Sequence, residues 1–174
     1  TAAAGSAPTV SAESKGMSVD AAVADGQEQC QAGVENYITQ RPWTNDLFDP
    51  DTLHQQSTGK GVTVAVIDSG VDVDNPHLKD AVVPGVSYLQ EDPTNGTTDT
   101  YSHGTAVAGI IAARNVQGSS VQGLAPEATI LPIRVFENIR EENGRQTGAP
   151  SMETVSQAII YAVDHHAQII NISL

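Results

Sequence analysis

The sequence is poor in cysteine, in basic residues and in long apolar runs, and each shortage excludes a class of protein. Cys30 is the one cysteine among 174 residues, so a scaffold of internal disulfides is excluded. No run approaches the ~20 apolar residues of a membrane-spanning helix, so we expect none in this chain. Lys and Arg number 8 against 21 Asp and Glu, which gives a net charge of −13. A surface this acidic repels phosphate backbones, so we expect no nucleic-acid partner.

A start methionine and a signal peptide are also missing. The chain begins with Thr1, and its first residues carry neither the basic end nor the apolar stretch of a secretory signal. We therefore expect a processed product or a piece of a longer chain. Hydrophobic residues make up 39% and charged residues 17% of the sequence, which is typical of one globular domain with a core.

Three regions of different composition divide the chain. Residues 1–26 are rich in Ala, Ser, Gly and Asp and have no hydrophobic period, which predicts a flexible N-terminal segment. Residues 27–60 contain scattered apolar residues, and we interpret them as an irregular N-terminal extension packed on a body, with Trp43 as its anchor. Residues 61–174 carry regular apolar patterns and form the body.

The body alternates strand patterns with helix patterns. Unbroken apolar runs, typical of strands buried on both faces of a parallel sheet, span residues 62–67, 129–136 and 168–174. Pro132 indicates that the second of these strands lies at an edge or contains a bulge. Small residues over 104–114 predict a closely packed helix, and the one-sided apolar pattern after the N-cap Ser151 predicts a second helix. This order predicts an α/β fold, a parallel β-sheet with helices on both faces.

Asp68 and His103 are the candidate chemical groups. Asp68 ends the first buried strand, where a carboxylate needs hydrogen-bond donors or a cationic partner. His103 opens the small-residue helix, where the helix dipole favours the neutral imidazole that a general base needs. Taken separately, Asp68 is as readily a turn residue and His103 a helix cap. The intervening residues are numerous enough for a loop to bring the two together at one end of the sheet.

Four short motifs in order resemble a known family. They are Asp68-Ser69-Gly70, His103-Gly104-Thr105, Gly123-Leu124-Ala125-Pro126 and Asn171-Ile172-Ser173-Leu174. Together they resemble the subtilisin-like serine proteases, the subtilase family, whose catalytic triad runs Asp, His, Ser along the chain. The resemblance implies a subtilisin-like sheet for residues 61–174 and an endopeptidase that hydrolyses peptide bonds in polypeptide substrates.

The same resemblance implies roles for single residues. Asp68 would orient the imidazole and stabilise its charged form, and His103 would be the general base and then the general acid. Ser173 and Leu174 match the strand that binds the substrate. The nucleophilic serine and the oxyanion asparagine have no counterpart, so we expect residues 61–174 to be an incomplete catalytic domain, inactive alone. A second chain or a C-terminal part would supply the serine.

A narrower resemblance begins at Cys30. Cys30, the run 41–46 and residues 57–68 resemble the mycosins, actinobacterial subtilases associated with type VII protein secretion. In that family a cysteine of the N-terminal extension pairs with one beyond the third strand, so the resemblance makes Cys30 a disulfide candidate whose partner lies outside this chain. The sequence departs from the family where Tyr101-Ser102, and no cysteine, precede His103.

The mycosin resemblance also implies partners and a location. It implies type VII secretion components as partners and an extracytoplasmic protein. Such a protein is secreted or is tethered to the outer face of the cytoplasmic membrane by a C-terminal anchor that is not in this chain. Two other functions stay open: a catalytically inactive, protease-like scaffold in a secretion complex, and a non-protease α/β binding domain. The second would require Asp68 and His103 to lie far apart.

The acidic residues after the first strand raise the question of a metal. Asp72, Asp74 and Asp80 could bind calcium, as subtilases often do. Their spacing matches no defined calcium motif, so a solvated loop is favoured. We therefore expect no metal site and no cofactor.

Overall fold

The computed structural model describes residues 37–142 and 145–174, so Cys30 and the expected flexible segment 1–26 lie outside the described residues. The elements, in chain order, are α1 (Trp43–Phe48), α2 (Pro50–Gln56), β1 (Thr63–Asp68), β2 (Val86–Ser87), α3 (His103–Ala112), β3 (Thr129–Arg134), β4 (Arg140–Glu142), β5 (Arg145–Thr147), α4 (Met152–Asp164) and β6 (Ile169–Ile172). Among the described helices, none combines the length and the apolar character that crossing a membrane requires.

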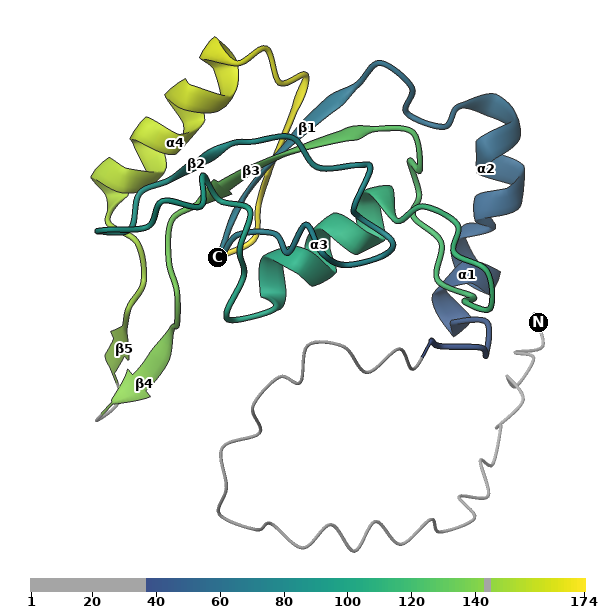
Figure 1. The fold of residues 1–174 in the computed structure, drawn as a ribbon, viewed down its shortest axis with the longest axis horizontal. Coiled ribbons are helices and arrows are strands. Elements are labelled where there is room, and N and C mark those ends of the chain that lie inside the picture. Colours follow the sequence, from purple (N-terminus) through teal and green to yellow (C-terminus); the bar gives the residue numbers. More distant parts are fainter. Residues whose placement is uncertain (1–36, 143–144) are drawn as a thin grey trace, which may run out of the picture. The chain divides into compact units, whose positions relative to one another are not determined.

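A four-stranded parallel sheet organises the body. Its strand order is β2-β3-β1-β6, and β4 and β5 form a separate antiparallel pair. Helix α3 lies on one side of the sheet and helix α4 on the other (Figure 1). The predicted α/β fold is confirmed. The carboxyl ends of β1 and β3 lie side by side, with Asp68 paired in register with Arg134.

Alternate side chains of β1 supply two separate cores. Val64 and Val66 pack with alanines of α3 in one buried cluster, and Ala65 and Ile67 pack with alanines of α4 in the other. This division follows from the period of two in a strand. The alanines that face the sheet are fully buried: Ala108, Ala112, Ala158 and Ala162. Because these side chains are small, both helix backbones lie close to the sheet. The small-residue pattern of residues 104–114 predicted this for α3.

Pro132 lies inside the sheet, so of the two features that it indicated, an edge or a bulge, the edge position is wrong. Strand β3 is flanked by β1 and β2, and the backbone of Ile130 bonds to Ala81 and Val83 on the β2 side. Pro132, two residues on, directs its nitrogen to the same side. Strand β2 begins only at Val86, so the neighbouring segment is interrupted where Pro132 has no N–H to donate.

The N-terminal extension contains two short helices where an irregular segment was expected. Asp49, in a left-handed conformation, separates α1 from α2, and its carboxylate accepts the backbone N–H of Thr52. Pro50 occupies the first turn of α2, where its fixed φ suits a helix. The prediction that Trp43 anchors this segment is wrong, because Trp43 is 75% exposed.

Polar contacts hold this extension to the body instead. The imidazole Nε2 of His54 lies 3.0 Å from the carbonyl oxygen of Gly123, and Gln122 donates to the carboxylate of Asp51 at 3.2 Å. The N–H of Ser120 donates to the carbonyl of Ile38 at 2.7 Å. Such contacts follow no hydrophobic period, so a search for apolar anchors does not find them.

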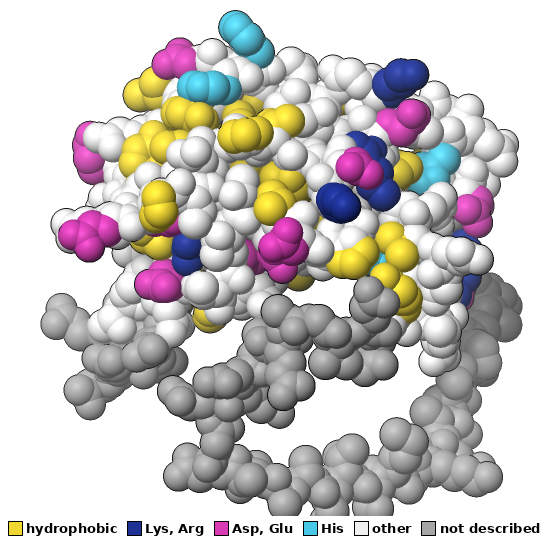
Figure 2. Space-filling model, viewed as in Figure 1, with side chains coloured by type: hydrophobic (Ala, Val, Ile, Leu, Met, Phe, Trp, Pro, Cys, Tyr) yellow, Lys and Arg dark blue, Asp and Glu magenta, His cyan; other side chains and the backbone are white. Residues whose placement is uncertain are grey.

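Apolar side chains also gather on the outer surface. Figure 2 shows them over α4, and they include Met152, Ile160 and Val163. Helix α4 therefore exposes apolar side chains among the polar residues of its outer face, in addition to those that pack against the sheet. Strand β6, at the edge of the sheet, exposes Ile169 and Ile172 in the same way.

We expect the substitution Ala108→Val to lower the free energy of unfolding by about 2 kcal/mol more than Ala106→Val, because added methyl groups overpack a closely packed interface. Both residues lie in α3, but Ala108 is fully buried and Ala106 is exposed. The loss of helix propensity on replacing alanine by valine is therefore the same in the two variants. Urea unfolding of the two variants measures the difference, and equal losses would show that α3 is not closely packed.

Candidate active site

Asp68 places a buried carboxylate at the carboxyl end of β1. Its side chain has no exposed surface. Its Oδ1 accepts the backbone N–H of Ser69 at 2.7 Å, and its Oδ2 accepts the hydroxyl of Ser173 at 3.3 Å. A desolvated carboxylate is costly unless such donors surround it. The remaining donor comes from α3.

His103 is the first residue of α3 and supplies that donor. Its Nδ1 lies 2.8 Å from Oδ1 and 3.0 Å from Oδ2 of Asp68. An ionised carboxylate can only accept, so this contact assigns the proton to Nδ1 and leaves a lone pair on Nε2. The His103 side chain is 45% exposed, so the ring is open to solvent although its partner is buried. An imidazole with a fixed tautomer and an open Nε2 can accept a proton.

Two glycines permit the close approach of strand end and helix start. A Cβ on Gly104 would lie 2.2 Å from the carbonyl oxygen of Gly70 and 3.1 Å from Cβ of Asp68. A Cβ on Gly70, whose φ is +105°, would lie 2.1 Å from the carbonyl oxygen of Thr98. No side chain fits at either position, so the distance between Asp68 and His103 depends on both glycines.

A buried ion pair stands at the end of the neighbouring strand. The Arg134 guanidinium donates to Asp92 at 3.0 Å and to the hydroxyl of Thr100 at 3.0 Å. Burial raises the pKa of Asp92, but hydrogen bonds from Ser87 and Thr94 and the charge of Arg134 outweigh burial and lower the pKa from 3.8 to about 2. The pair is therefore ionised at neutral pH.

Several residues near His103 were not predicted from the sequence. The ring of Tyr101 lies 6.4 Å from the ring of His103 and 5.7 Å from that of Phe136, which gives the imidazole an aromatic neighbour. In the loop before α3, the carboxylate of Asp99 accepts the hydroxyl of Ser69 and the backbone N–H of Ser102. The sequence could have pointed to Arg134, because a charged residue ends an otherwise apolar strand. In the loop, the one available indication was an acidic residue shortly before a helix.

The structure places the other predicted residues as follows. Ser173 lies beside the Asp68–His103 pair, and its single hydroxyl proton is shared between Oδ1 of Asn171 at 2.9 Å and Oδ2 of Asp68 at 3.3 Å. Leu174 is 49% exposed. Within residues 37–142 and 145–174, no three His, Cys, Asp or Glu side chains are grouped so that they could hold a metal ion. The carboxylate of Asp72 instead accepts the backbone N–H of Asp74 at 2.9 Å.

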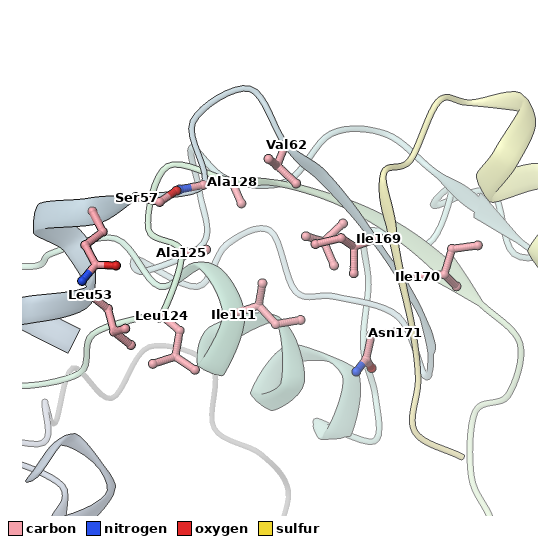
Figure 3. A pocket seen from close by; sticks show the side chains of 13 residues that line it. Leu53, Ser57, Val62, Ile111, Leu124, Ala125, Ala128, Ile169, Ile170 and Asn171 are labelled. Carbon is pink, nitrogen blue, oxygen red and sulfur yellow. The ribbon is translucent and has the colours of Figure 1, made fainter. Parts of the chain in front are cut away.

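An apolar groove of about 560 Å³ lies elsewhere in the body. Figure 3 shows its lining of apolar side chains from α2, α3 and β6, among them Leu53, Ile111 and Ile169. Neither Asp68 nor His103 lines it. The groove therefore does not contain the two candidate groups, although Asn171, which bonds to Ser173, lines it.

Comparison with known families agrees with the motifs. The model of the Subtilase family matches residues 59–174. A thermophilic serine proteinase of Bacillus sp. strain AK1 is 36% identical over 152 residues, which span 80% of this chain and 35% of that protein. Mycosin-1 of Mycobacterium tuberculosis is 34% identical over 141 residues, which span 76% of this chain and 31% of mycosin-1.

Solved structures give the same result. The structure of the MycP3 protease from the type VII (ESX-3) secretion system matches with a TM-score of 0.64 at 35% identity. The match covers 78% of this chain and 37% of the MycP3 chain. The chain thus spans about a third of the length of the curated relatives described above.

We expect Asp92→Asn to lower the free energy of unfolding at pH 7 by about 3 kcal/mol, because it removes the buried carboxylate partner of Arg134 and leaves only the exposed Glu137 at 3.8 Å. The folded-state pKa of Asp92 is lowered, so its stabilising contribution is complete above 3.8 and is lost as the pH falls toward 2. The gap between wild type and variant should therefore close over that range. Urea unfolding at several pH values, with exposed Glu91→Gln as control, measures it. A gap that is independent of pH would contradict the ion pair.

Proposed function

Because the chain belongs to the subtilase family, we propose that Asp68 and His103 are the aspartate and histidine of the Asp–His–Ser triad of a serine endopeptidase. The observation that carries this proposal is the contact of 2.8 Å between Nδ1 of His103 and the buried carboxylate of Asp68, together with the exposure of the ring. The non-protease alternative required these residues to lie far apart, and that condition is not met.

The geometry supports a two-step proton transfer. Nε2 of His103 takes the proton from a serine hydroxyl while the serine oxygen attacks the scissile carbonyl carbon, and the imidazolium then gives that proton to the leaving amine. Water repeats the sequence to release the acyl product. Asp68 stays ionised throughout, holds the tautomer with the proton on Nδ1, and stabilises the imidazolium.

We propose that the nucleophilic serine is outside these 174 residues and that the chain alone is inactive. Two serine hydroxyls near the pair are already engaged, that of Ser69 with Asp99 and that of Ser173 with Asp68 and Asn171. Among the described strands, β6 is an edge strand that exposes Ile169 and Ile172. Natural sheets rarely leave such an apolar edge uncovered, which supports further residues of a catalytic domain as its cover.

Substrate would bind along the segment that follows β6. Ser173 and Leu174 follow the edge strand, and Ser173 contacts Asp68, so an extended peptide that paired with their backbone would lie near His103. We propose polypeptides as the substrate class on this ground.

The similarity to mycosin-1 and to MycP3 supports a narrower proposal. The protein is a mycosin-like protease that acts outside the cytoplasm, secreted or anchored to the outer face of the cytoplasmic membrane, with type VII secretion components as partners. Cys30 would form a disulfide with a cysteine outside these residues.

We expect His103→Ala to reduce peptide hydrolysis by the full protein by about 10⁴-fold or more, because the general base is removed. His165→Ala, at the exposed end of α4, is the matched control and should keep wild-type activity. Circular dichroism checks the folding of both variants. Retention of full activity by His103→Ala would overturn the assignment. A fluorophosphonate probe that labels no serine in the full wild-type protein would favour the inactive scaffold instead.

We expect Cys30 of the native protein to resist alkylation until a reductant is added, because a disulfide protects it. Intact mass spectrometry before and after reduction identifies what Cys30 is joined to, and Cys30→Ser is the control. Alkylation of Cys30 without reduction would show a free thiol and contradict the proposed pairing.

A further inference from the structure

The carboxylate of Asp99 accepts five hydrogen bonds in the loop before His103. Its Oδ1 accepts the hydroxyl of Ser69 at 2.9 Å and the backbone N–H groups of Tyr101 and Ser102 at 3.0 and 2.8 Å. Its Oδ2 accepts the N–H and the hydroxyl of Thr105 at 2.9 and 2.6 Å. Within the described part of the chain, Asp99 forms no ion pair with a Lys or Arg. The N–H and O–H donors therefore satisfy the carboxylate.

These contacts fix the start of α3. The first N–H groups of a helix have no partner within the helix, and Asp99 accepts one of them, that of Thr105, from outside. A negative charge at this end is also favoured by the helix dipole. Ser102, the residue before His103, has a φ of +68°, a conformation that residues other than glycine rarely adopt. The bond from its N–H to Asp99 holds it there.

Ser69 joins this loop to the strand that carries Asp68. The Ser69 hydroxyl has one proton, and because a carboxylate can only accept, that proton goes to Asp99. The oxygen of Ser69 is then free to accept the N–H of Gly104 at 3.0 Å. The backbone N–H of the same serine donates to Oδ1 of Asp68 at 2.7 Å. Ser69 thus contacts Asp68, the partner of His103, through its N–H, and Gly104, the residue after His103, through its hydroxyl oxygen.

We propose that Asp99 is a positioning residue for His103. Through Ser69, Ser102 and Thr105 it sets the start of α3 so that Nδ1 meets Asp68, and it does so without contact with substrate or reacting atoms. This inference rests on the proposed protease function for its kinetic consequence, but its geometric consequence does not depend on that function.

The kinetic test compares Asp99→Ala and Asp99→Asn with Asp164→Ala in the full protein. Asp164 is an exposed carboxylate at the end of α4, far along the chain from the loop. We expect Asp99→Ala to lower kcat by about 100-fold, the cost of a misplaced catalytic group, with KM little changed. Asp99→Asn should lose about tenfold, because its oxygen replaces one acceptor but its amide opposes the donors of Thr105. Asp164→Ala should match wild type.

A double-mutant cycle with Ser69→Ala tests the route. If Ser69 acts through Asp99, the losses from the two substitutions should be strongly non-additive. Additive losses would show that the two residues act independently and would overturn the proposed route.

A second readout does not require proteolysis. Nitrogen-15 NMR of the His103 ring reports which nitrogen carries the proton and whether Nδ1–H is hydrogen-bonded. We expect Nδ1–H in wild type and in Asp164→Ala, and a mixture of tautomers in Asp99→Ala. If the wild-type protein shows the hydrogen-bonded Nδ1–H but cleaves no peptide, the proposed protease function fails. The ring signals of the Asp99 variants then still test whether Asp99 positions His103. Wild-type kcat and an unchanged ring signal in a folded Asp99 variant would overturn the proposal, and Asp99→Asn decides the matter if Asp99→Ala does not fold.

Discussion

The hydrogen bond between His103 and the buried carboxylate of Asp68 is the interaction on which the candidate site depends. Asp68 has no exposed surface, and its oxygens accept from Ser69, His103 and Ser173. A desolvated carboxylate that lost one of these donors would be strongly destabilising. The need to satisfy this carboxylate therefore brings the start of α3 and the segment after β6 to the carboxyl end of β1. The same hydrogen bonds thus serve both the stability and the candidate chemistry of the site.

Local patterns predicted the parts of this site that reside in regular elements. Asp68 ends a strand and His103 begins a helix as predicted, and Ser151 caps α4 by accepting the N–H of Thr154. Such features depend on neighbouring residues, so they can be read from a short window. The small residues of α3 predicted close packing, although only the structure shows that Gly104 lies against Gly70 and Asp68.

Features that depend on distant or irregular segments could not be predicted in this way. Arg134 and Asp92 are 42 residues apart, and Ser69 and Asp99 are 30 apart, with no periodic pattern to link either pair. Pro132 and Trp43 were misplaced for a related reason. General preferences for proline and tryptophan were overruled by an interrupted neighbouring strand in one case and by polar contacts of the extension in the other.

The site contains two separate pairs, the buried ion pair of Arg134 with Asp92 and the pair of His103 with Asp68. Arg134 is paired in register with Asp68 across β1 and β3, yet its guanidinium bonds to Asp92 and Thr100. Had Arg134 compensated Asp68, the carboxylate would have had less need of His103, and less charge to offer an imidazolium. Asp92 engages the arginine, and N–H and O–H donors satisfy Asp99. Among the described residues, Asp68 is thereby left with His103 as its one cationic partner when the imidazole takes up a proton. The proposed triad requires this of its aspartate.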